Sequence, residues 1–151
     1  MLSAAAAALL SSPALAVGPT ELKTVVTTAQ KTSATGDLTI DSGGGINYKS
    51  SSAALLTIDS SNTVNNGGAL TAADQDTQTA IAIDANGLTG GLDSNGTIAL
   101  GGTGTTKKAV YLTGASFFNG NITLDSNSVV SIVGDSSMGV VSDSNSVLNG
   151  D

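Results

Sequence analysis

The sequence predicts an all-β fold, a right-handed parallel β-helix (β-solenoid) of about 4–5 coils with an open C-terminal end. Two short strand patterns recur with a shared period, and apolar residues alternate with small or polar ones inside each copy. Clusters of turn-forming residues separate the copies. Because an isolated copy has no partner for its apolar face, the copies must stack on one another.

The composition fits a thin core built from rows of aliphatic side chains. Hydrophobic residues make up 40% of the 151 residues, whereas aromatic residues reach only 3% and charged residues 11%. An ordinary soluble domain has about 25% charged residues, so Gly, Ser, Thr, Asn and Ala take the place of charge here. Small side chains of this kind favour turns and strands over a large globular core.

The charge and the missing residue types exclude several functional classes. The net charge is −7, and no arginine accompanies the five lysines. Nucleic acids and anionic membranes both require clustered cations, so we expect no nucleic-acid partner. Without histidine or cysteine, the chain cannot form a Ser-His-Asp or Cys-His nucleophile, a disulfide or a thiolate metal site.

The N-terminus has the features of an export signal. Residues 2–16 are apolar and rich in alanine, and they end in an Ala-x-Ala cleavage pattern at residues 14–16. We therefore predict a signal peptide over residues 1–16. The alternative is an Ala-rich helix packed on the domain. No lysine or arginine precedes the apolar run, so we expect the natural start to lie upstream of Met1.

The rest of the chain divides into a lead-in and a repeat region. Residues 17–35 are predicted to be an N-terminal capping segment, in which residues 24–27 form a first strand over the open end of the array. Residues 36–151 are predicted to be β-helix repeats, truncated at the C-terminus because the chain stops inside a copy at Gly150 and Asp151.

The first pattern is a glycine, any residue, and then leucine or isoleucine. It begins at Gly36, Gly68, Gly96 and Gly120, and it starts again at Gly150. If these copies are equivalent, Leu38, Leu70, Ile98 and Ile122 form a single row inside the solenoid. The residues before three of the glycines, Asn95, Asn119 and Asn149, are then expected to form an amide ladder at one corner.

The second pattern runs in phase with the first. It begins at Leu56, Ile81, Val110 and Val140, and three of its copies are followed by Asp59, Asp84 and Asp143. Between the strands we expect turns at residues 41–44, 65–67, 93–95, 125–127 and 143–145, where Asx, Ser and Gly residues gather.

These repeats resemble the passenger region of bacterial autotransporters, over about residues 20–151. The likeness rests on the signal-like start, on the segments 95–98 and 119–122, and on the strands 80–83 and 109–112. It implies an exported protein at the outer membrane, on the cell surface or in the extracellular space. It also implies a C-terminal translocator barrel in the full-length chain, and partners among the glycans or proteins of host or neighbouring cells.

No catalytic, cofactor-binding or metal-binding residue is assigned. Asp59, Asp84 and Asp143 are candidates for paired catalytic carboxylates or calcium ligands, and the loop 74–76 is another calcium candidate. An aspartate after a strand is more simply a turn residue. The glycine-rich segment 101–104 is interpreted as a loop and the Lys107-Lys108 pair as solvated, whereas Phe117 and Phe118 should point to opposite sides of a corner.

The sequence therefore predicts a structural or adhesive β-solenoid segment that is not an enzyme. Two alternatives remain open. One is a polysaccharide-active β-helix enzyme whose site lies in missing coils, and the other is a carbohydrate-binding β-solenoid.

Overall fold

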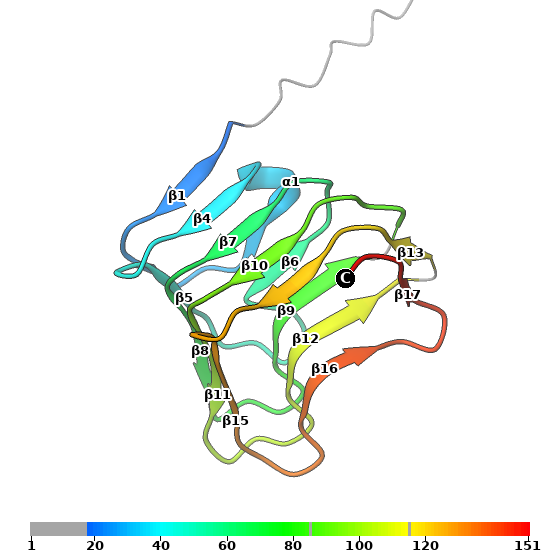
Figure 1. Ribbon diagram of the computed structural model, residues 1–151. Coiled ribbons are helices and arrows are strands. Elements are labelled where there is room, and N and C mark those ends of the chain that lie inside the picture. Colours follow the sequence, from blue (N-terminus) through cyan, green and yellow to red (C-terminus); the bar gives the residue numbers. More distant parts are fainter. Residues whose placement is uncertain (1–17, 85, 115) are drawn as a thin grey trace, which may run out of the picture.

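The computed structural model describes residues 18–84, 86–114 and 116–151, and they form a parallel β-solenoid (Figure 1). The predicted signal peptide, residues 1–16, lies outside the described residues. Every strand pairing is parallel, and strands from successive coils stack into three five-stranded sheets. The predicted fold class is confirmed, and three strands complete each coil.

The strands are distributed over the three faces as follows. Sheet A contains β1 (Thr20–Leu22), β4 (Leu38–Ile40), β7 (Val64–Asn66), β10 (Leu92–Ser94) and β14 (Ile122–Leu124). Sheet B contains β2 (Val25–Val26), β5 (Gly45–Asn47), β8 (Ala69–Ala73), β11 (Thr97–Gly101) and β15 (Val129–Ile132). Sheet C contains β3 (Gln30–Lys31), β6 (Leu56–Ile58), β9 (Thr79–Asp84), β12 (Lys108–Thr113) and β16 (Met138–Ser142). A short fourth ladder pairs β13 (Phe117–Phe118) with β17 (Val147–Leu148), and α1 (Thr32–Thr35) follows β3.

The coils lengthen along the chain. In sheet A the stacked partners are Thr20, Leu38, Val64, Leu92 and Ile122. Successive turns therefore take 18, 26, 28 and 30 residues. The final coil closes where the amide of Ile122 donates to the carbonyl oxygen of Asp151, at 2.7 Å.

The predicted single row of Leu38, Leu70, Ile98 and Ile122 is wrong. Leu38 and Ile122 belong to sheet A, whereas Leu70 and Ile98 are neighbours in sheet B. The glycine pattern marks the start of a strand after a tight corner, and two different corners need it. Two inner columns result: Leu38, Val64, Leu92 and Ile122 in sheet A, and Ile46, Leu70, Ile98 and Val130 in sheet B.

The second pattern has the predicted register. Leu56, Ile81, Val110 and Val140 are successive partners in sheet C and form its inner column. The first three are completely buried. This column faces those of sheets A and B, so that the three together fill the thin aliphatic core that the composition predicts.

The placement of polar residues differs from the prediction at two corners of the solenoid. Asn149 Nδ2 donates to Asn119 Oδ1 at 3.0 Å, but Asn95 lies between sheets A and B and does not extend this ladder. Asn66 and Ser94, expected in turns, instead end strands β7 and β10. Both are buried, and Asn66 Nδ2 donates to Ser94 Oγ at 3.0 Å. An inward pair of hydrogen-bonded polar side chains therefore takes positions that aliphatic residues occupy in other coils.

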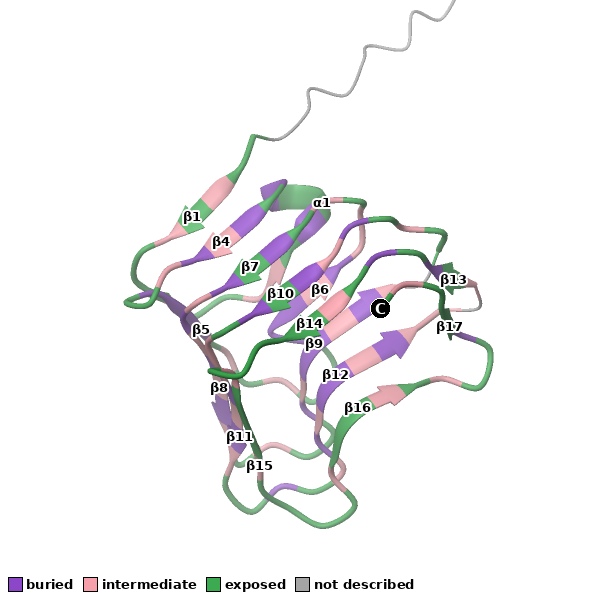
Figure 2. Ribbon diagram, in the orientation of Figure 1, coloured by how far each residue is buried: buried purple, intermediate pink, exposed green. Residues whose placement is uncertain are grey.

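The last coil exposes apolar side chains that earlier coils bury (Figure 2). Eight large hydrophobic residues in it are exposed: Leu124, Val129, Val130, Val133, Met138, Val140, Val147 and Leu148. Val140 is 60% exposed, although its column partner Val110 is fully buried, because none of the described residues forms a further coil on that side of β16. Phe117 is 52% exposed and Phe118 fully buried, so these rings point to opposite sides as predicted.

This gradient of burial predicts a gradient of local stability. We expect amide hydrogens of β8, β9 and β11 to exchange slowest and those of residues 122–151 fastest, since local opening is easiest where few apolar contacts must break. Hydrogen exchange followed by mass spectrometry measures this. Equal protection of β15 and β11 would contradict the prediction.

Candidate functional site

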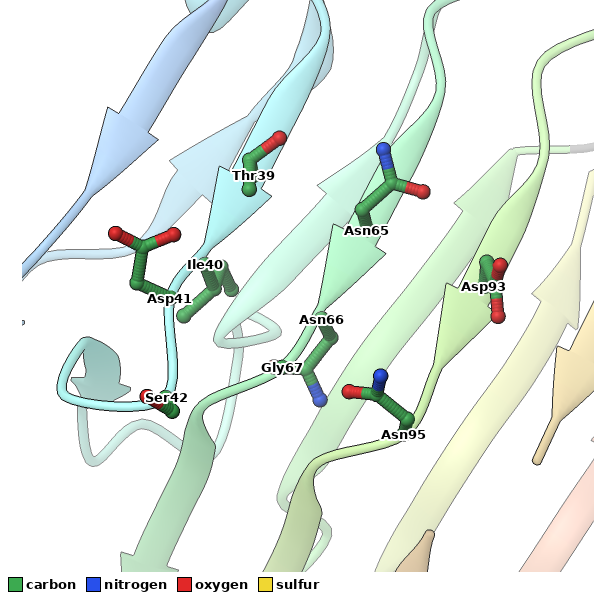
Figure 3. A pocket seen from close by; sticks show the side chains of 9 residues that line it. All are labelled: Thr39, Ile40, Asp41, Ser42, Asn65, Asn66, Gly67, Asp93 and Asn95. Carbon is green, nitrogen blue, oxygen red and sulfur yellow. The ribbon is translucent and has the colours of Figure 1, made fainter. Parts of the chain in front are cut away.

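Two shallow grooves lie on the outer surface of the solenoid. The first, groove A, has a volume of about 430 Å³ and crosses the outer face of sheet A where it turns into sheet B. Thr39, Asn65 and Asp93 are stacked partners that point outward from three successive coils (Figure 3). Asp41, Ser42 and Asn95 extend the lining at the corner. Groove A therefore presents amide and carboxylate groups with no cation among them.

Groove C lies on the outer face of sheet C and has a volume of about 330 Å³. Its lining comprises Ser51, Ser52, Ala53, Ala54, Thr77, Thr79, Ala82, Lys108, Tyr111 and Thr113. Thr57, Ala82 and Tyr111 are successive outer partners, so the small Ala82 side chain leaves a recess beside the Tyr111 ring. The lining thus combines one aromatic ring, several hydroxyl groups and a single ammonium group.

A buried glutamine holds one wall of groove C in place. Gln78 is 1% exposed, and its Oε1 accepts a hydrogen bond from the Ser50 amide at 2.7 Å. Its Nε2 donates to the carbonyl oxygen of Ala53 at 3.1 Å, and Thr77 Oγ1 donates to that of Ser51 at 3.0 Å. The loop that carries residues 51–54 is therefore fastened to the next coil at three points.

The opposite wall is held through Tyr111. Its hydroxyl group donates to Asp143 Oδ1, and Lys108 Nζ lies 4.0 Å from the centre of its ring. The hydrogen bond to the Asp143 carboxylate raises the pKa of Tyr111 above its usual value of 10.0, and burial and the negative charge of Asp143 act in the same direction. The position of the Tyr111 ring is thus fixed by contacts within the protein.

The raised pKa predicts a loss of stability in alkali. A raised native pKa contributes stability that is complete below the unfolded value of 10.0 and is lost as pH rises through the native value. In a Tyr48→Phe background, Tyr111 is the only tyrosine. We expect Asp143→Asn to lower the pH at which Tyr111 ionises, measured by tyrosinate absorbance. An unchanged titration curve would show that Asp143 does not cause the shift.

The three candidate aspartates do not form one cluster. Asp59 and Asp84 follow the paired residues Ile58 and Ile83, but Thr113 is the partner of Asp84 and separates it from Asp143. Asp59 accepts hydrogen bonds from the Ser33 amide and hydroxyl group, both at 2.8 Å, and so ties the first turn of α1 to the next coil. Over the described ranges, no group of three His, Cys, Asp or Glu residues is placed to hold a metal ion.

The calcium candidate at residues 74–76 fastens one loop to the next. Asp76 Oδ1 accepts from the Thr105 amide at 2.7 Å and from its hydroxyl group at 3.1 Å. These hydrogen bonds, the one from the amide above all, hold the pKa of Asp76 below its usual value of 3.8. Gly104 packs against the Gln75 carbonyl, where an added Cβ would lie only 2.1 Å from the oxygen. The glycines of segment 101–104 therefore permit close loop stacking.

The prediction of a solvated Lys107-Lys108 pair is wrong for Lys107. Its side chain is 1% exposed, and its ammonium group donates to three carbonyl oxygens: Gly101 at 2.6 Å, Val133 at 2.7 Å and Gly102 at 3.1 Å. Lys107 thereby joins the loop of the fourth coil to the fifth. Sequence alone offers no signal for this, because only the stacked loops bring the carbonyl groups together.

Comparison with protein-family models, curated proteins and solved structures yields no match. In the part of the chain that the structure describes, no helix is long and apolar enough to cross a membrane.

Proposed function

We propose that the chain is an exported, surface-displayed β-solenoid segment with a structural and adhesive role and no catalysis of its own. The observation that carries this proposal is the repetitive outer surface. On sheet A, Thr39, Asn65, Asp93 and Thr123 stand one above another from coil to coil. Such a column offers hydrogen-bonding groups at a regular spacing of about 4.8 Å, fixed by the backbone ladder beneath.

The interior of the solenoid supports the same proposal. The backbone ladders, the stacked glycines and Lys107 all join one coil to the next. A rod of this kind holds its outer side chains rigidly, and rigid groups lose little entropy when they bind. We further propose that the chain belongs to an autotransporter-type passenger, exported through residues 1–16 and followed in the full-length protein by a translocator barrel.

An adhesion assay tests the proposal. Beads coated with the full chain should bind to glycan-bearing cell surfaces in a saturable way, and beads coated with albumin should not. Binding no greater than that of the albumin beads would reject the adhesive role. The same protein should leave dissolved polysaccharides intact, and release of reducing ends would favour the polysaccharide-active alternative.

A further inference from the structure

We propose that groove C binds a saccharide unit that carries a carboxylate group. This inference deepens the proposed adhesive function, on which it rests, by naming a ligand class and a site for it. Lys108 is the one charged residue in the lining of groove C, and the nearby Asp143 carboxylate is already engaged by the hydroxyl groups of Tyr111 and Thr113. Groove A contrasts with it, because Asp41 and Asp93 make that surface anionic.

The chemistry of the lining matches the parts of a sugar acid. The apolar C–H face of a pyranose ring packs on aromatic rings and small aliphatic groups, which Tyr111 and Ala82 provide. Hydroxyl groups of the sugar can exchange hydrogen bonds with Thr77, Thr79 and Ser52. A carboxylate group completes the match by pairing with the Lys108 ammonium group.

Lys108 is available for this pairing. In the described part of the chain, the one ion pair within 4.0 Å joins Lys23 to Glu21, at 2.9 Å. Lys108 instead lies over the Tyr111 ring, with its Nζ 4.0 Å from the ring centre, and this cation–π contact is weaker than a salt bridge with a carboxylate in a partly buried groove. A carboxylate ligand can therefore draw the ammonium group toward it without breaking an existing salt bridge.

The groove is also built in advance of binding. Gln78 fixes the loop on one side, and Asp143 fixes Tyr111 on the other. Because both walls are held from behind, the ligand does not have to order them, and this reduces the entropic cost of binding. A volume of about 330 Å³ falls at the lower end for small-molecule sites and suits one or two sugar units.

Titration of the full chain by NMR tests the inference. Trigalacturonate and sialyllactose are the acidic probes, which distinguish a uronic acid from a sialic acid source, and lactose is the neutral probe. We expect at least one acidic probe to shift the resonances of Ala82, Tyr111 and Thr113, with lactose binding at least about tenfold more weakly. Added salt should weaken binding of the acidic probe further.

Matched variants locate the binding. Lys108→Met should weaken binding of the acidic probe at least about tenfold, whereas Lys49→Met, which removes a lysine outside the groove, should not. Ala82→Leu keeps Lys108 but fills the recess, and it should also abolish binding in a chain whose circular dichroism is unchanged.

Several results would overturn the inference. They are no shift with either acidic probe at millimolar concentration, equal affinity for lactose, or equal weakening by Lys108→Met and Lys49→Met. Beads that still adhere to cells while groove C binds no probe would refute this site and leave the proposed function standing. Beads that do not adhere to cells, while groove C still binds an acidic probe, would refute the proposed adhesive function and leave the binding site standing.

Discussion

Replacing Gly120 with alanine is expected to destabilise the solenoid by about 3 kcal/mol or more, because backbone atoms occupy the space that a Cβ would need. The added Cβ would lie 1.5 Å from the Gly90 carbonyl oxygen and 2.8 Å from Phe118 Cζ. Gly150 stacks on Gly120 in the same way, and a Cβ added at Gly150 would lie 2.1 Å from the Gly120 carbonyl oxygen. The chain makes this corner with stacked glycines so that the backbones of successive coils can approach closely.

Gly101→Ala is the matched control for this substitution. A Cβ added at Gly101 would have no atom within 4 Å, and Ala73 already occupies the equivalent place in the coil before it. We expect its free energy of unfolding to change by less than about 0.5 kcal/mol. Urea denaturation of both variants measures the difference. Equal effects of the two substitutions would mean that the corner is not close-packed.

Lys107→Met is expected to cost about 3 kcal/mol of stability, the second large effect. The substitution keeps much of the aliphatic side chain but leaves the carbonyl oxygens of Gly101, Gly102 and Val133 without their shared donor. A hydrogen bond that involves a charged group contributes about 1.5–3 kcal/mol. The loss of three such bonds is partly offset because the Gly101 carbonyl oxygen still accepts from the Asp74 amide and because no ammonium group has to be buried.

Lys108→Met controls for the loss of a positive charge at a neighbouring position. Lys108 contacts the face of Tyr111, and we expect its removal to cost less than about 1 kcal/mol. Thermal unfolding of both variants provides the comparison. A Lys107→Met protein as stable as the native chain would show that the three hydrogen bonds contribute nothing beyond the cost of burying the charge.

The sequence predicts the fold class because aliphatic alternation and turn chemistry recur in every coil. The register was predictable only in sheet C, where Leu56, Ile81, Val110 and Val140 all retain an aliphatic residue at the same place. In sheet A the strands β7 and β10 carry Asn66 and Ser94 on the inside, which makes them look like turns. Because the sequence does not identify β7 and β10 as strands, the glycine motifs that precede sheet A and those that precede sheet B were interpreted as a single repeat.

Groove C was beyond prediction for a different reason. Its lining comes from the second, third and fourth coils, so residues such as Ser52, Ala82 and Tyr111 become neighbours only through stacking. Tyr111 has the sequence context of any strand residue, and Ala82 matters because it is small where its neighbours are larger. Local motifs identify the strands of a solenoid. A surface site also depends on the number of residues in each turn, because that number decides which side chains of successive coils become neighbours.

The stacking register is tested most directly by spin-label distances, and the absence of native cysteine makes labelling simple. Thr39 and Asp93 point outward from sheet A two coils apart, so their backbones should lie about 10 Å from each other. Thr71 belongs to sheet B and should lie farther from Thr39. Strong dipolar broadening for the Thr39/Asp93 pair and weak broadening for the Thr39/Thr71 pair is the predicted result. The reverse order would place Leu38 and Leu70 in one column and contradict the three-sheet register.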